Sequence, residues 1–179
     1  MTMTVILITG MPGSGKEEFL KVAEEEGYDL VRMGDVVREK AEMENISEKD
    51  ISVGEFADKE RKEKHEGIWA DRTLAKVHEK NTVIDGIRSL TEVNIFKSEL
   101  EKDARIVAIH SSPDTRFERL KERDRHDAPK TRSQFRERDE RELGWGLGDV
   151  IARADEMIVN EGSLSQMQDK SKELLKKLN

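Results

Sequence analysis

The chain has 179 residues, of which 40% are charged and 35% are hydrophobic, and its formal net charge is −7. This length suits one domain with its own core, and the negative charge argues against a protein whose main affinity is for a nucleic-acid backbone. Cysteine is absent, which excludes disulfides and thiolate metal sites, and no apolar run approaches the roughly 20 residues that span a bilayer. We therefore expect one cytoplasmic domain, residues 1–179, with neither nucleic acid nor membrane as a partner.

Short apolar runs alternate with longer helical patterns along the chain. The candidate strands are Val5–Thr9, Asp29–Val31, Thr82–Ile84, Arg105–His110 and Glu156–Val159. These runs lack the apolar and polar alternation of half-exposed strands, as is typical of strands that are covered on both faces. The sequence therefore predicts an α/β fold with a five-stranded parallel sheet and helices on both of its faces.

Helix starts are marked by a Ser or Thr that is followed three residues later by Glu or Gln. Four such pairs occur, namely Ser52 with Glu55, Ser89 with Glu92, Thr131 with Gln134 and Ser163 with Gln166. A fifth start, Ser112-Pro113-Asp114, predicts a helix that ends near Glu122. The segment Lys49–Lys80 has a helical pattern throughout, so we expect a helical insertion that lies over the sheet.

The first functional signal, GMPGSGKE, directly follows the first predicted strand and opens a helical pattern. Its glycines let successive backbone N–H groups point inward, and the helix N-terminus adds the positive end of its dipole, so a polyphosphate is the expected ligand. Lys16 would reach the β- and γ-phosphates. The residues expected to bind the nucleotide are Gly10, Met11, Pro12, Gly13, Ser14, Gly15, Lys16 and Glu17.

Glu17 stands where a phosphate-binding loop usually has a Ser or Thr that binds Mg²⁺. A carboxylate beside a triphosphate is repelled unless a metal lies between them. Three interpretations stay open: Glu17 binds the metal directly, it points away and leaves magnesium to water and Asp85, or the site binds nucleotide without efficient catalysis. An acidic residue is also favoured at a helix N-terminus for its interaction with the helix dipole alone.

Two further motifs follow the second and third predicted strands. MGDVVR places Asp35 and Arg38 at the start of a helix, and VIDGIR places Asp85 at a strand end with Arg88 in the loop beyond it. Because the carboxyl ends of parallel strands meet at one edge of a sheet, both motifs should lie beside the phosphate-binding loop. There Asp85 could hold the water shell of a magnesium ion.

The segment Arg116–Arg141 is rich in arginine and lysine, nearly balanced by acidic residues. A lid that folds over bound phosphates excludes water and supplies arginines to a transferring phosphoryl group, and we expect such a lid at residues 123–138. Its candidate arginines are Arg119, Arg123, Arg138 and Arg141, of which Arg123 and Arg138 are preferred because they flank the lid. A pair of solvated helices joined by salt bridges is the alternative.

The motifs GMPGSGK, MGDVVR and VIDGIR resemble those of adenylate kinase and the other nucleoside monophosphate kinases. The segment ADEMIVNEGSL is more similar to the closing strand, loop and helix of dephospho-coenzyme A kinase. The combination resembles an archaeal family of adenylate-kinase-related P-loop proteins. This resemblance implies a three-layer P-loop kinase fold with a helical acceptor-binding region, residues 33–80, and a short lid.

The resemblance also implies an enzyme that uses ATP and Mg²⁺ and transfers the γ-phosphoryl group to a small-molecule acceptor, a nucleoside monophosphate. Carried over by position, Asp35, Arg38 and Arg88 would bind the acceptor, and Glu17 and Asp85 would bind the metal. The implied catalytic residues are Lys16, Asp85, Arg88, Arg123 and Arg138. The third motif is one residue shorter than that of adenylate kinase and lacks its proline.

Two alternatives stay open. An alcohol acceptor, as in dephospho-coenzyme A kinase or a nucleoside kinase, would need a general base, and Asp35 is an available carboxylate. The chain could instead be an NTP-binding switch or assembly factor that hydrolyses slowly and acts through a protein partner. Glu17 and the densely charged sequence favour that second alternative.

Overall fold

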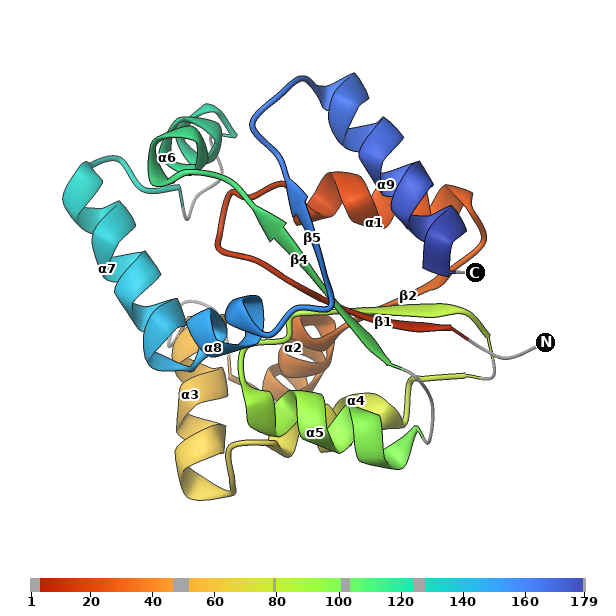
Figure 1. Cartoon of the computed structure of the whole chain (residues 1–179). Coiled ribbons are helices and arrows are strands. Elements are labelled where there is room, and N and C mark those ends of the chain that lie inside the picture. The colour runs from red at the N-terminus through yellow and green to blue at the C-terminus, as the bar shows by residue number, and fades with distance from the viewer. Residues whose placement is uncertain (1–3, 47–51, 79, 101–103, 124–127, 179) are drawn as a thin grey trace.

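Five parallel strands form the centre of the protein in a computed structural model that describes residues 4–46, 52–78, 80–100, 104–123 and 128–178. The strands are β1 (Val5–Thr9), β2 (Asp29–Arg32), β3 (Thr82–Asp85), β4 (Arg105–His110) and β5 (Glu156–Val159). Their order in the sheet is β2-β3-β1-β4-β5 (Figure 1). The predicted five-stranded parallel sheet is thus confirmed, with β2 and β3 each one residue longer than predicted.

Helices cover both faces of the sheet, as Figure 1 shows. One face carries α1 (Lys16–Glu25) and α9 (Leu164–Leu178). The other carries α2 (Met33–Met43), α3 (Val53–Glu63), α4 (Ile68–Leu74), α5 (Leu90–Glu99) and α8 (Leu147–Ala152). The pair α6 (Pro113–Glu122) and α7 (Arg132–Gly144) lies at the carboxyl edge of the sheet.

The apolar core is divided between the two faces of the sheet because side chains alternate along each strand. Ile6 and Ile8 of β1 pack with Phe19 of α1, whereas Val5 and Leu7 pack with the helices of the opposite face. All five residues of β1 are buried, as the apolar run predicts. The predicted three-layer architecture is therefore confirmed.

The strand register brings charged residues together at the carboxyl edge. Arg32 of β2 and Ile8 of β1 are both register partners of Asp85 in β3. The first turn beyond β1 is the phosphate-binding loop, which leads directly into α1. The ends of three neighbouring strands therefore meet at one site.

The predicted helix starts are confirmed by side-chain caps. The Ser52 and Ser89 hydroxyls accept hydrogen bonds from the backbone N–H groups three residues ahead, and both form complete capping boxes. Thr131 and Ser163 accept equivalent bonds at the starts of α7 and α9, and Ser112 caps α6. Among the described helices, none is both long enough and apolar enough to cross a membrane.

The prediction of one helical run over 49–80 is wrong for the residues that the structure describes, 52–78 and 80. The chain leaves the helix after Glu63 and starts α4 only at Ile68. The break lets Trp69 fold back into the core, where its indole N–H donates to the Ala57 carbonyl at 3.1 Å. Gly67 permits close packing there, since a Cβ would lie 2.1 Å from the Ile95 side chain. Residues 49–51 and 79 lie outside the described residues.

Candidate active site

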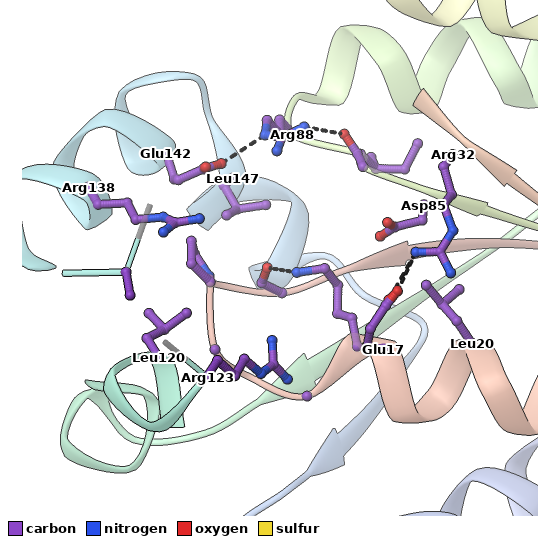
Figure 2. Close-up of a pocket in the computed structure, with 18 residues that line it drawn as sticks. Glu17, Leu20, Arg32, Asp85, Arg88, Leu120, Arg123, Arg138, Glu142 and Leu147 are labelled. Atoms are coloured by element: carbon purple, nitrogen blue, oxygen red, sulfur yellow. Dashed lines mark hydrogen bonds and ion pairs between the residues drawn. The ribbon is translucent and has the colours of Figure 1, made fainter. Parts of the chain in front are cut away.

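A pocket of about 300 Å³ opens where the phosphate-binding loop meets the ends of β2 and β3 and the helices α6 and α7. Figure 2 shows the charged side chains that converge on it. The basic ones are Lys16, Arg32, Arg88, Arg123 and Arg138, and the acidic ones are Glu17, Asp85 and Glu142. Five basic against three acidic side chains leave a net charge of +2, so the pocket favours anionic ligands.

The phosphate-binding loop requires glycine at two crowded positions. Gly15, the residue before α1, has a φ of 100°, and a Cβ on it would lie 2.2 Å from the side-chain nitrogen of Asn160. A Cβ on Gly10 would lie 2.4 Å from the Ile109 carbonyl oxygen. Of the predicted loop residues, Met11 and Ser14 do not line the pocket, whereas the other six do.

The rear of the loop is held by side chains from distant elements. The Ser14 carbonyl accepts hydrogen bonds from Asn160 at 2.9 Å, from the Ser111 hydroxyl at 3.2 Å and from Arg119 at 3.5 Å. Arg116 donates to the Pro12 carbonyl at 3.1 Å. Arg119, a candidate lid arginine by sequence, therefore supports the loop from behind and does not line the pocket.

Lys16 points its ammonium group back along the loop, where Nζ donates to the Gly10 carbonyl at 2.7 Å. Burial lowers the pKa of Lys16, although the nearby carboxylates of Asp85 and Glu142 act in the opposite direction. A polyphosphate in the pocket would offer this cation a stronger acceptor than a neutral carbonyl.

Asp85 ends β3 inside the pocket, and its Oδ1 atom is buried without a hydrogen-bond partner. Such an orphaned carboxylate oxygen fits a cation that is bound together with the nucleotide. Across the described residues, no three histidine, aspartate or glutamate side chains form a ready-made metal site. Magnesium commonly takes one or two carboxylates, with waters and substrate phosphates as its other ligands, and Asp85 suits this arrangement.

Glu17 lines the pocket and forms an ion pair with Arg32, at 2.9 Å between Nη1 and Oε2. The two side chains are 29% and 35% exposed, respectively. Burial would lower the pKa of Arg32, but the hydrogen bond and charge of Glu17 outweigh it, so that the pKa is raised. The sequence analysis missed Arg32, although a basic residue ending a strand beside Asp85 was a signal for it.

Arg88 forms a second ion pair, with Glu142 of α7, at 2.8 Å between Nε and Oε2. Its Nη1 also donates to the Gly86 carbonyl at 3.1 Å, and its backbone N–H donates to Glu92 at 2.8 Å. Burial would raise the pKa of Glu142, but the charge of Arg88 outweighs this effect and lowers it. Glu142 was also missed by the sequence analysis, because its partner lies 54 residues away.

An aromatic side chain extends this second pair toward α3. The guanidinium groups of Arg88 and Arg61 lie 5.6 and 5.3 Å from the centre of the Trp145 ring. The indole N–H of Trp145 donates to Asp58 at 3.2 Å. The wall of the pocket around Arg88 is thus continuous with the helices that cover one face of the sheet.

The arginines that flank the predicted lid, Arg123 and Arg138, both line the pocket (Figure 2). Their helices are joined by Arg116 of α6, which binds both carboxylate oxygens of Asp139 in α7, at 2.8 and 2.6 Å. Arg141 does not line the pocket, and its guanidinium lies 5.9 Å from the Trp145 ring centre. Residues 124–127 of the predicted lid lie outside the described residues.

Asp35 and Arg38 are not brought into the pocket. They form an ion pair with each other in the first turns of α2, and both side chains are about half exposed. Asp35 still lies close enough to Arg32 to contribute to its raised pKa. Their assignment to the acceptor remains a prediction.

Comparison with known proteins shows which family the chain belongs to. Residues 9–136 match a family model described as an AAA domain. A UPF0200 protein of Thermoplasma volcanium is 45% identical over 172 residues and aligns with 96% of each chain. A UPF0200 protein of Methanopyrus kandleri is 45% identical over 183 residues, which cover 96% of this chain and 89% of that one.

Solved structures share the fold at low sequence identity. TT1252 from Thermus thermophilus superposes with a TM-score of 0.68 at 18% identity, over the whole of both chains. A gluconokinase from Sinorhizobium meliloti gives 0.62 at 18% identity, covering 99% of this chain and 94% of that one. A shikimate kinase from Acinetobacter baumannii, solved with shikimate, gives 0.60 at 12% identity and covers 97% and 93%. The chain has the fold of P-loop kinases and belongs to the archaeal UPF0200 family.

Proposed function

We propose that this protein transfers the γ-phosphoryl group of ATP to a nucleoside monophosphate. The observation that carries the proposal is the convergence of five basic side chains from separate elements on one pocket behind a phosphate-binding loop. Two phosphate-bearing ligands in one pocket repel each other, so their approach requires several cations held in fixed positions. The proposal needs no nucleic acid or membrane and assigns the reaction to the cytoplasm.

The reaction follows from the charge of the acceptor. An ionised oxygen of the monophosphate attacks the γ-phosphorus while the bond between that phosphorus and the β–γ bridging oxygen breaks. The products are ADP and a nucleoside diphosphate, and no general base is required because the attacking oxygen already lacks its proton. Catalysis then depends on positioning and on neutralising charge.

Each basic residue takes a part that fits its place in the pocket. Lys16 would bind the β- and γ-phosphates, and Arg123 and Arg138 would stabilise the transferring group from the side of α6 and α7. Arg88 would orient the acceptor phosphate. Magnesium bound with ATP would supply charge neutralisation, and Asp85, with or without Glu17, would hold it.

An acceptor panel with γ-labelled ATP tests this proposal. We expect label to appear in a nucleoside diphosphate, and ADP formation to require the added acceptor. Replacing Lys16 with Ala should abolish the transfer. The control is Lys177→Ala, which removes a surface cation of α9 that pairs with Glu156 of β5, and it should leave the transfer unchanged. Hydrolysis of ATP at the same rate with every acceptor and with none would contradict the proposal and favour the switch.

An alcohol acceptor is the second candidate, favoured by the structural likeness to a kinase that was solved with shikimate. Such a reaction needs a base, and the orphaned oxygen of Asp85 makes it the better placed carboxylate, since Asp35 does not line the pocket. Dephospho-coenzyme A and nucleosides therefore belong in the same panel. Transfer to an alcohol, lost in Asp85→Asn or Asp35→Asn, together with no transfer to monophosphates, would establish this candidate.

A further inference from the structure

The pair formed by Glu17 and Arg32 combines two features that an ordinary surface ion pair lacks. Both side chains line the pocket, yet both remain about one third exposed. Partly solvated ion pairs contribute little to stability, so either partner can turn to a ligand at small cost. Both hydrogen bonds of the pair use Nη1 of Arg32. Within the described part of the chain, Nε and Nη2 have no hydrogen-bond partner, which leaves them available to an anion.

The neighbour of this pair supplies a second, independent observation. Arg32 is the register partner of Asp85, whose buried Oδ1 has no hydrogen-bond partner. In Figure 2 the three side chains lie on the same side of the pocket. One cation and two carboxylates therefore meet where the acceptor phosphate and the metal of the proposed reaction would meet. An orphaned oxygen requires a donor or a cation, and none of the described residues supplies it.

We propose that Arg32 binds a phosphate oxygen of the acceptor in place of Glu17, and that the released Glu17 then joins Asp85 as a ligand of the divalent cation. This inference rests on the proposed function and adds a binding residue to it. The exchange changes no side-chain charge in the pocket. The two members of one ion pair separate, and Arg32 then binds the anion while Glu17 binds the cation. Phosphate and metal must consequently bind with positive cooperativity, and each must raise the affinity for the other by the same factor.

Binding of Mn²⁺, measured by electron paramagnetic resonance with and without inorganic phosphate, tests the exchange without any turnover. In the unmodified protein we expect phosphate to raise the Mn²⁺ affinity on the order of tenfold, within the usual range of coupling between sites. In Arg32→Ala this dependence should disappear. The Mn²⁺ affinity without phosphate should be at least that of the unmodified protein, because Glu17 is already free.

Replacing Glu17, the other member of the pair, should affect the binding of phosphate and Mn²⁺ in opposite directions. In Glu17→Gln, Arg32 is released from its partner, so phosphate should bind more tightly while Mn²⁺ binds more weakly. The matched control is Lys177→Ala, which breaks a surface ion pair far from the pocket and should keep the full coupling. A thermal unfolding scan of each variant confirms that it is folded.

Two results would overturn the exchange. If Arg32 merely holds Glu17 in place for the metal, Arg32→Ala will weaken Mn²⁺ binding even without phosphate. If the coupling arises from phosphate in the loop alone, it will survive in Arg32→Ala. Either result, found in a protein that transfers phosphoryl groups in the acceptor panel, removes this inference and leaves the proposed function intact. Coupling that depends on Arg32, without transfer to any acceptor, would instead remove the proposed function.

Discussion

Two arginine–glutamate pairs face the same pocket from opposite sides and differ mainly in burial. The pair of Arg32 and Glu17 is about one third exposed, and among the described residues Glu17 is the only hydrogen-bond partner of the Arg32 guanidinium. In the pair of Arg88 and Glu142, the glutamate side chain is 9% exposed, and Arg88 makes further contacts with Gly86 and Trp145. Identical chemistry in two settings thus indicates two uses, a pair that can exchange with ligands and a pair that holds α7 in place.

The difference in burial predicts a difference in energy. A solvent-exposed pair is worth about 0–1 kcal/mol, because water competes for both charges. Removing one partner of a buried pair costs about 3–5 kcal/mol, because the remaining charge is left in a poorly solvated place. Measurements of stability and of ligand binding can therefore test whether the two pairs differ in this way.

The largest effect should come from Arg88→Ala. It leaves the Glu142 carboxylate buried without its main partner, so the free energy of unfolding should fall by about 3 kcal/mol, the low end for a buried pair. The low end applies because the Arg88 side chain is itself 33% exposed. Urea denaturation followed by circular dichroism measures the change. A loss as small as that of Arg32→Ala would show that the two pairs do not differ.

The second-largest effect should be a change in how the free energy of unfolding depends on acidic pH. The pKa of Glu142 lies below the ordinary glutamate value of 4.5, since the charges of Arg88 and Lys16 outweigh burial. Glu142 therefore contributes stability that is present above pH 4.5 and is lost as the pH falls through its lower value in the folded protein. In Glu142→Gln the decline of the unfolding free energy between neutral and acidic pH should be shallower. Equal slopes in the two proteins, from denaturation at a series of pH values, would contradict the assignment.

A smaller effect is expected for the exposed pair. Arg32→Ala and Glu17→Gln should each change the free energy of unfolding by less than about 1 kcal/mol. For a chain of this size that corresponds to a shift of at most about 2–4 °C in the melting temperature. Differential scanning calorimetry without ligands makes the measurement. A loss of several kcal/mol in either variant would mean that this pair is structural, and the exchange proposed above would lose its energetic basis.

The smallest effect should come from Arg38→Ala. This residue forms a half-exposed pair with Asp35 within one helix, and such pairs contribute about 0.3–0.5 kcal/mol. High salt should remove even this difference, because exposed charges are screened. Melting curves of the variant at low and high salt make the check. A larger loss would indicate that α2 depends on this pair more than its exposure suggests.

The sheet and the phosphate-binding loop could be predicted because their signals are local. The apolar runs Arg105–His110 and Glu156–Val159 match β4 and β5 to the residue. Glycine spacing after a buried strand identified the loop, and serine caps located several helix starts. The break after Glu63 was missed because the charged pattern continues through it, whereas the burial of Trp69 just beyond it is a tertiary contact.

The pairing inside the pocket could not be predicted in the same way. Arg123 and Arg138 were found from their place beside the expected lid, but Arg32 and Glu142 acquire their roles only when the chain brings them to partners 15 and 54 residues away. Arg119 shows the converse, since its charge indicated a site for phosphate while its guanidinium donates to Ser14, Ser111 and Asn160 behind the loop. The sequence thus shows where charged residues lie along the chain. Which of these charges are available to a ligand depends on the partners that they meet in the folded protein.

The contact between Asn160 and the Ser14 carbonyl has a consequence for synthesis on the ribosome. One of the fixed hydrogen bonds of the loop comes from a residue that lies 146 positions later in the chain, beyond β5. Because domains generally fold as units, the growing chain cannot hold this loop in its final shape until Asn160 and the strand before it have also been translated. A nascent chain truncated before Asn160 should therefore bind nucleotide poorly even though its glycine-rich loop is intact.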